Sequence, residues 1–335
     1  MQNSAYNIID NLLVPHTLFT RACDRIRINY EASRTCREPI CLALIGESRT
    51  GKSRCLEYVE NLFPRQRTEE SMLIPILRIK TPAKPTVKGL VEACLRNIGD
   101  PHWDSRGSES TKTERLKKIL RRTDTTMVMI DEFQHFYDQG SHKVQHHVAD
   151  WLKILVDDAK LALVVSGIPS CMAVINQNEQ LRGRFTSALH MSRFDWINRN
   201  DREDFIDTLV ALQEGLSDYD MPDLGSEEMA FRFYCASGGL IGYVTKIMRQ
   251  ALWNAINANT RTIRMQDLAV ACDEALWRHQ PDRPYSPFDP QFSAVPTEHK
   301  VKLAQHIGKT DLDESALPGA STPLSRSPAK PGKVH

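Results

Sequence analysis

The chain has 335 residues, of which 41% are apolar and 25% charged, and its formal net charge at pH 7 is +1. This length predicts two folded units with flexible ends, and a near-neutral charge favours no class of partner. No apolar run reaches the about 18 to 20 residues of a membrane span, and the N-terminal MQNSAYNIID lacks a signal-peptide pattern. We therefore expect a cytoplasmic protein without a membrane partner.

The cysteines and histidines give no sign of a metal centre. Eight cysteines are scattered without a CxxC pair, and several lie within apolar runs. They are expected to pack as small hydrophobic residues in a reducing compartment. His142 and His146 stand four residues apart, with His147 beside them, but no carboxylate or thiol set accompanies them. We interpret them as the solvent-facing start of a helix.

The first half of the chain alternates predicted helices with predicted strands. An amphipathic helix from His16 to Ser33 precedes the apolar run ICLALI (40–45), and the next helix follows the turn GESRTGKS (46–53) and ends at Pro64. Further strands are predicted at 71–79, 126–130 and 161–166, with helices at 90–98, at 111–122 and around 144–156. Pro75 predicts an edge strand or a bulge. This order indicates an α/β fold with a mostly parallel sheet covered on both faces.

From residue 200 onward the pattern is helical. Four amphipathic helices are predicted between residues 201 and 279, and they form a second, all-helical unit. Beyond Pro281 the chain is rich in Pro, Ser, Lys and Gly, which bury too little apolar surface to fold. We expect an N-terminal helical segment (1–35), an α/β domain (36–198), a helical lid (199–280) and a flexible C-terminal tail (281–335).

GESRTGKS fits the Walker A pattern G-x-x-x-x-G-K-[ST] and lies between a predicted strand and a predicted helix, as a P-loop requires. Its glycines let backbone N–H groups surround the phosphates of a nucleotide. Lys52 is expected to neutralise the β and γ oxygens, and the Ser53 hydroxyl to ligate Mg²⁺. The predicted ATP-binding residues are Gly46, Glu47, Ser48, Arg49, Thr50, Gly51, Lys52 and Ser53.

Asp131 and Glu132 end the predicted strand TMVMI about 80 residues after this loop, as in a Walker B motif. Because the carboxyl ends of parallel strands share one edge of the sheet, both acids are expected beside the phosphates. Asp131 is predicted to bind ATP and hold Mg²⁺, and Glu132 to activate the attacking water. Ser166, which ends the next strand, is predicted to contact the γ-phosphate or that water; turn chemistry is the alternative. The sequence thus predicts a P-loop ATPase.

QLRGRF (180–185) places two arginines shortly after the strand that ends at Ser166. A guanidinium there is expected to reach the γ-phosphate held by an adjacent subunit and to stabilise charge in the transition state. We favour Arg184 in this role, with Arg182 second; a surface arginine pair is the alternative.

The set GESRTGKS, MVMIDEFQHF, VVSGIP and QLRGRF resembles the AAA+ ATPases of the TniB/TnsC group, transposition regulators of bacterial transposons. The resemblance covers residues from about 10 to 290 and includes the TPAKPT loop. It implies ATP-dependent assembly into rings or filaments around duplex DNA, which connects a target selector to transposase subunits. In several such systems the selector is a CRISPR effector with a TniQ-type adaptor.

In one position the sequence departs from the AAA+ pattern. Many AAA+ proteins carry an arginine at the start of the lid helix, whereas GGLIGYVTK places Gly242 there, with Lys246 one turn on as a substitute. Without that arginine we expect slow hydrolysis and a long-lived ATP-bound state.

The segment from Arg78 to Arg122 holds twelve Lys or Arg against five Asp or Glu, while the segment from Asp195 to Glu228 holds two against eleven. With the resemblance, the basic segment predicts sequence-tolerant binding of duplex phosphates. Two solvated faces without partners are the alternative. The predicted DNA-binding residues are Lys80, Lys84, Lys88, Lys117, Lys118, Arg121 and Arg122.

The leading interpretation is therefore a DNA-binding AAA+ regulator of transposition. The alternatives are a signalling or defence NTPase, a loader of replication proteins and a scaffold that binds nucleotide without hydrolysing it. We also expect the apolar tail residues Tyr285, Phe288 and Phe292 to dock a partner such as a transposase.

Overall fold

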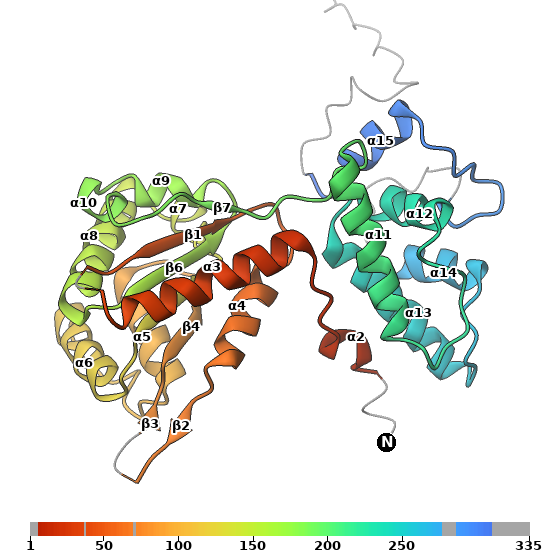
Figure 1. Ribbon diagram of the computed structural model, residues 1–335. Helices are drawn as coiled ribbons and strands as arrows, with labels where there is room; N and C mark the ends of the chain where they lie inside the picture. The colour runs from red at the N-terminus through yellow and green to blue at the C-terminus, as the bar shows by residue number, and fades with distance from the viewer. Residues whose placement is uncertain (1–5, 37, 70–71, 277–285, 310–335) are drawn as a thin grey trace, which may run out of the picture.

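The computed structural model describes residues 6–36, 38–69, 72–276 and 286–309. Figure 1 shows two lobes, an α/β lobe made by the chain from about residue 17 to 190 and a helical lobe made mainly by the described residues from 199 to 309. None of the helices in the described part combines the length and the apolar character that crossing a membrane requires.

The α/β lobe is built on one five-stranded sheet. Its order is β4-β5-β6-β1-β7, and every pairing in it is parallel. The strands are β1 (Cys41–Ile45), β4 (Ile76–Lys80), β5 (Met127–Asp131), β6 (Ala162–Gly167) and β7 (Leu189–His190). Strands β1, β5 and β6 are buried along their whole length, because helices cover both faces; for this reason they form continuous apolar runs in the sequence.

Two cores lie on the two faces of this sheet. Alternate strand residues such as Leu42 and Val164 pack against α3 (Thr17–Ser33) and α4 (Lys52–Leu62). Their neighbours Ala43 and Val165 pack against helices on the other face. Those helices are α5 (Val87–Ile98), α6 (Glu109–Arg122), α7 (His135–Asp138), α8 (His142–Ala159), α9 (Cys171–Ile175) and α10 (Glu179–Arg182).

The two edge strands of the sheet, β4 and β7, differ in part from the sequence prediction. The run 71–79 is divided at Pro75 into β3 (Met72–Leu73), which forms a hairpin with β2 (Gln66–Arg67), and the edge strand β4. The edge position that Pro75 predicted is thus confirmed. The other edge strand, β7, was not predicted, since only two of its residues pair with β1.

The helical lobe holds more of the chain than the four predicted helices. It contains α11 (Arg199–Glu214), α12 (Glu227–Ser237), α13 (Ile241–Asn257) and α14 (Met265–Ala275), together with α15 (Glu298–Gln305). The N-terminal α2 (Ile8–Asn11) also packs here, and its Asp10 pairs with Arg249 of α13. The expected N-terminal segment 1–35 is therefore shared between the lobes, since α3 covers the sheet.

Part of the expected flexible tail is folded. Phe288 is fully buried against Phe233, with ring centroids 4.9 Å apart, and Val301 and Ala304 of α15 are also buried. The proposed docking role of Phe288 is therefore contradicted, because its ring fills the lobe's own core. Phe292 packs against the same core and is partly buried, whereas Tyr285 and residues 310–335 lie outside the described residues.

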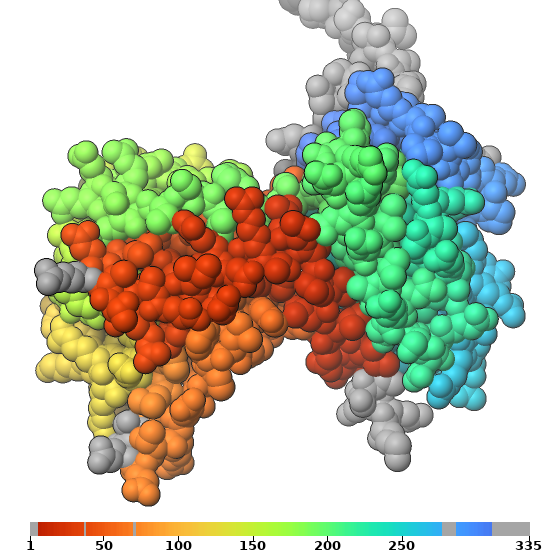
Figure 2. All heavy atoms as spheres, viewed as in Figure 1, coloured from red at the N-terminus to blue at the C-terminus, as the bar shows by residue number. Residues whose placement is uncertain are grey.

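The first turn of α3 joins the two lobes. The backbone N–H of Thr17 donates to both carboxylate oxygens of Asp204 in α11, at 3.1 and 3.0 Å. His16 caps the same helix and lies against Phe194 of the connecting segment, with ring centroids 5.0 Å apart. In Figure 2 this N-terminal segment, in red, runs across the front of the molecule from one lobe to the other.

Candidate nucleotide-binding site

The P-loop lies where β1 ends and α4 begins, as the pattern predicts. Gly51 (φ 95°) and Arg49 (φ 68°) have left-handed backbone conformations, which curl the loop. A Cβ on Gly46 would meet the carbonyl oxygen of Met191 at 2.0 Å, so only glycine fits there. The loop is thus held closely against the chain that follows β7.

Lys52 lies beneath this loop with 9% of its surface exposed. Its ammonium donates to the carbonyl oxygens of Gly46 and Glu47, at 2.8 and 2.6 Å. Burial lowers the pKa of Lys52, and the nearby carboxylates of Glu132 and Asp131 oppose this shift. The charge therefore lies between the loop and the acids, in a position where phosphate oxygens can replace the carbonyl acceptors. The Ser53 side chain is exposed in the first turn of α4.

The two acids lie at the same edge of the sheet. Asp131 is the last residue of β5, and its Oδ1 accepts from the backbone N–H of Glu132 at 2.9 Å. Glu132 has a left-handed backbone (φ 56°), and its Oε2 accepts from the side-chain amide of Gln134. Gln134 in turn accepts from the N–H of Ile168 at 3.3 Å. The sequence did not predict this role of Gln134, although Gln134 lies within MVMIDEFQHF.

Ser166 lies in β6, between the strands that carry the loop and the acids. Its side chain is completely buried, and its hydroxyl has no hydrogen-bond partner among the residues that the structure describes. A buried hydroxyl without a partner at a strand end is the kind of group that a ligand or a water satisfies. The Asp131 carboxylate and the Ser53 hydroxyl supply hard oxygen atoms of the kind that Mg²⁺ takes as ligands, and the Ser166 hydroxyl can donate to a phosphate oxygen or a water.

Arg182 and Arg184, the two candidates for the arginine that reaches a neighbouring subunit's γ-phosphate (the finger), lie at the other end of the strands, where the strands begin. The carbonyl of Arg184 accepts from the N–H of Cys41, the first residue of β1, whereas the P-loop follows the last. A strand of this length spans roughly 16 Å, so both side chains lie out of reach of their own P-loop. Arg182 is 56% exposed, whereas Arg184 pairs with Asp157 at 2.5 Å.

Helix α13, in the segment predicted to form a lid, begins directly on the P-loop. The N–H of Gly242 donates to the carbonyl oxygen of Arg49 at 3.0 Å, and a Cβ on Gly242 would lie 2.8 Å from Cβ of Arg49. The Arg49 guanidinium lies over the ring of Tyr243, 4.8 Å from its centroid. This close approach explains the glycine at the position where many AAA+ proteins carry an arginine. Lys246, on the next turn, is partly exposed.

The structure does not bring the seven basic candidates onto one surface. Lys80, the last residue of β4, is in register with Asp131, so the exposed Lys80, Lys84 and Lys88 lie near the edge that carries the nucleotide site. The other four candidates lie in the second half of α6, toward the end of the sheet where β5 begins. There Lys117 is buried and pairs with Asp158 at 2.6 Å and Glu114 at 2.9 Å, while Arg121 donates to the Asp158 carbonyl at 2.9 Å; Lys118 and Arg122 are exposed.

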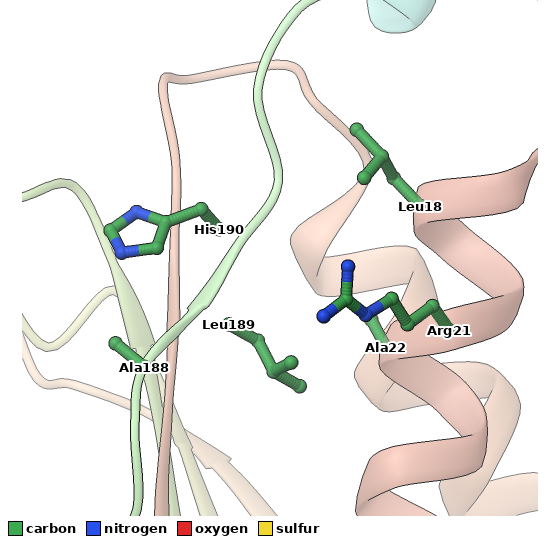
Figure 3. A pocket seen from close by; sticks show the side chains of 6 residues that line it. All are labelled: Leu18, Arg21, Ala22, Ala188, Leu189 and His190. Carbon is green, nitrogen blue, oxygen red and sulfur yellow. The ribbon is translucent and has the colours of Figure 1, made fainter. Parts of the chain in front are cut away.

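Two remaining features lie apart from this site. A cavity of about 160 Å³ between α3 and β7 is lined by Leu18, Arg21, Ala22, Ala188, Leu189 and His190 (Figure 3), none of which was predicted to bind nucleotide. The predicted helix start holds His142 and His146 with ring centroids 4.7 Å apart, and Nε2 of His147 lies 2.7 Å from the Glu109 carboxylate. All three imidazoles are exposed.

Residues 7–222, which carry the P-loop, both acids and both finger arginines, match the family described as bacterial TniB protein. The chain belongs to the TniB family. No curated protein matches the chain.

Solved structures share the fold of this TniB-family chain. Cdc6p from Pyrobaculum aerophilum has a TM-score of 0.60 at 15% identity, over 82% of this chain and 72% of that one. The Aeropyrum pernix ORC2 protein, in ADPNP-ADP complexes, has a TM-score of 0.58 at 12% identity, over 80% and 71%. The Aeropyrum pernix ORC1 protein, in complex with DNA, has a TM-score of 0.58 at 15% identity, over 80% and 69%. The chain is thus an α/β protein with the AAA+ fold.

Proposed function

We propose that this protein is a DNA-binding ATPase that assembles on duplex DNA when it binds Mg-ATP and thereby regulates DNA transposition. The observation that carries the proposal is the meeting of Lys52, Asp131, Glu132 and Ser166 where the strands of the sheet end, beside the P-loop that the first turn of α13 contacts. This arrangement gathers a cation, two carboxylates and a buried hydroxyl around the loop that cradles phosphates.

In the proposed reaction each side chain has a separate task. The N–H groups of residues 46–53 and the Lys52 ammonium bind phosphate oxygens, and Ser53 and Asp131 hold Mg²⁺, which neutralises charge on the phosphates when bound. Glu132 accepts a proton from the attacking water, and Ser166 orients that water or the γ-phosphate. Arg182 of a neighbouring subunit completes the site, because its guanidinium is exposed whereas that of Arg184 is paired with Asp157.

The DNA surface that we propose is the loop and helix start with Lys80, Lys84 and Lys88, since these three exposed ammonium groups share the edge of the nucleotide site. Phosphate contacts of this kind bind DNA without reading its sequence. The ORC1 protein solved in complex with DNA has the same fold, which supports a DNA partner for this chain. Lys117 is left out because two carboxylates neutralise it.

Membership in the TniB family supports the role in transposition. The proposed partners are further copies of this chain, transposase subunits and a TniQ-type adaptor acting with a CRISPR effector. Because Gly242 replaces the lid arginine, we expect slow hydrolysis, so that the ATP-bound assembly persists long enough to recruit these partners.

The test is electron microscopy of the purified protein with duplex DNA, with and without a slowly hydrolysed ATP analogue. We expect rings or filaments only with nucleotide, none for Lys52→Ala, and persistent assemblies for Glu132→Gln in ATP. Assembly that is equal with and without nucleotide would contradict the proposal. ATP hydrolysis without retention of DNA would favour a signalling, defence or loader NTPase, and bound ATP without phosphate release would favour a scaffold.

A further inference from the structure

The guanidinium of Arg193 connects three segments that are far apart in the chain. Its Nε donates to both carboxylate oxygens of Glu47 in the P-loop, at 3.0 and 3.1 Å, and its Nη2 also donates to Glu47. Its Nη1 lies 3.1 Å from three carbonyl oxygens, those of Gly238 at the end of α12 and of Gln305 and Ile307 at the end of α15. The side chain is only 10% exposed, so these contacts replace water around the charge.

On the P-loop side, Arg193 holds the residue that shapes the phosphate cradle. The carbonyl of Glu47 accepts from Lys52 at 2.6 Å and from the Thr50 hydroxyl at 2.9 Å. The hydrogen bonds from Arg193 keep the pKa of Glu47 below its usual range, so this carboxyl stays charged. Without Arg193 an unpaired negative charge would face the phosphates and repel them.

On the other side, the acceptors of Arg193 depend on the docking of α15. Val301 and Ala304 bury α15 in the helical lobe, and a Cβ on Gly238 would meet the carbonyl oxygen of Ala304 at 2.4 Å. The turn after α15 ends at Gly308 (φ 81°), where a Cβ would lie 2.9 Å from Cδ1 of Leu240. Undocking of α15 therefore removes two of the three carbonyl acceptors from a nearly buried guanidinium.

We propose that Arg193 is a positioning residue that couples the docking of residues 298–309 to ATP binding. The inference rests on the proposed nucleotide site and adds a regulatory segment to it. Loss of two acceptors leaves a buried charge undersatisfied, which displaces Arg193 and releases Glu47. ATP affinity then falls, and because coupling is reciprocal, bound ATP must strengthen the docking of α15 by the same factor. Any partner that draws this segment away weakens the ATP site.

The first test is a double-mutant cycle in the full chain, read as the Kd of a fluorescent ATP analogue. Arg193→Gln is expected to raise Kd about tenfold, with a smaller change in kcat at saturating ATP. In a Glu47→Gln background the same substitution should have little effect, since no carboxylate then needs neutralising. A tenfold loss that is independent of Glu47 would overturn the proposal and indicate direct contact between Arg193 and phosphate.

The second test perturbs α15 without touching the P-loop. Val301→Ala, which loosens the buried face of α15, is expected to raise Kd about fivefold. Lys302→Ala on the exposed face, where Lys302 pairs with the exposed Glu298, is the control and should leave Kd unchanged. Amide hydrogen exchange of residues 298–309 should slow when ATP is added to the wild-type protein and remain unchanged in Arg193→Gln.

The two proposals fail in different ways. If wild-type protein binds no nucleotide, the proposed function itself is contradicted. If wild type binds ATP but Val301→Ala keeps the wild-type Kd and exchange of residues 298–309 does not respond to ATP, only the coupling through Arg193 is contradicted.

Discussion

The side-chain amide of Gln134 donates to the carboxylate of Glu132, two residues earlier in the chain. The oxygen of the same amide accepts from the N–H of Ile168, just beyond the end of β6. Gln134 therefore links the proposed general base to the strand that carries Ser166. Because it holds one of the two Glu132 oxygens, the direction of the other is restricted as well.

We expect Gln134→Ala to lower kcat about tenfold, because a general base loses efficiency when its geometry is not fixed. The Kd for ATP should change little, since Gln134 does not contact the P-loop through any of its hydrogen bonds described above. Single-turnover hydrolysis at saturating ATP measures the effect, and Gln139→Ala, on an exposed position after α7, is the control. A faster rate in Gln134→Ala would mean that the contact restrains Glu132 instead of positioning it.

Gly242→Ala tests the contact between the lid helix and the P-loop. A methyl group on residue 242 would lie 3.0 Å from the carbonyl oxygen of Arg49 and 2.8 Å from the Cβ of Arg49, so either α13 or the P-loop must move. Overpacking of this kind costs about 1 to 3 kcal/mol, and we expect the Kd for ATP to rise about tenfold. Gly107→Ala is the matched control, because its added methyl meets only Lys112 side-chain atoms at 3.8 Å. Equal Kd values for both variants would contradict a role of this contact in ATP binding.

The sequence predicted the elements whose residues are buried on every side. The runs around Leu44, Met129 and Val164 are continuous and apolar because helices cover both sheet faces, and the motif residues follow directly from where those strands end. The short strand β7 was missed, since two residues carry no periodicity. The docking of α15 was missed because the segment around it is mostly polar. A few buried apolar residues, among them Phe288, Val301 and Ala304, hold this segment in place. Composition alone does not reveal such contacts.

The long-range side-chain pairs of the site were also beyond prediction. Arg193 and Glu47 are 146 residues apart, and neither the spacing nor the residue types distinguish this pair from other surface arginines and glutamates. Arg184 was preferred over Arg182 for contact with a neighbouring subunit, but the ion pair of Arg184 with Asp157 depends on how α8 packs. The basic residues follow one another in the sequence, but they divide in the fold. Those after β4 lie where the strands end, whereas those in α6 lie toward the end where β5 begins.

For DNA binding, we expect the double substitution Lys84→Ala/Lys88→Ala to weaken ATP-dependent binding of duplex DNA. The slope of log K against log salt is negative, and each lost phosphate contact reduces its magnitude by about 0.9, so the slope of the double variant should be less steep by about 2. Lys118→Ala/Arg122→Ala is the control, since these exposed residues lie toward the opposite edge of the sheet. Fluorescence anisotropy over a salt series gives both slopes. A larger loss in the control pair would assign the DNA surface to α6.

For the finger, we expect Arg182→Ala to reduce hydrolysis in the assembled state to the rate of unassembled protein. Among the described residues, the exposed Arg182 side chain makes one ion pair, a 4.0 Å contact with Glu179, so folding should be unaffected. Mixing Arg182→Ala with Glu132→Gln should restore activity, because about one in four interfaces in an equal random mixture joins an intact base to an intact finger. Full hydrolysis by assembled Arg182→Ala alone would contradict this role of Arg182 and return it to Arg184.

The free energy of unfolding should depend on pH through His16, which lies where the first turn of α3 connects the two lobes. Burial lowers the pKa of His16 from 6.5, and the Asp204 carboxylate opposes the shift only in part. Below pH 6.5 the unfolded chain therefore binds a proton that the folded chain does not, so the contribution is fully present above pH 6.5 and is lost as pH falls toward the folded pKa. His16→Asn keeps a side-chain acceptor at this helix cap but does not titrate. Urea unfolding at pH 7.5 and 5.5 should show a smaller loss of stability in His16→Asn than in wild type, whereas the exposed control His299→Asn should behave as wild type. Equal losses in all three proteins would show that His16 does not govern this pH dependence.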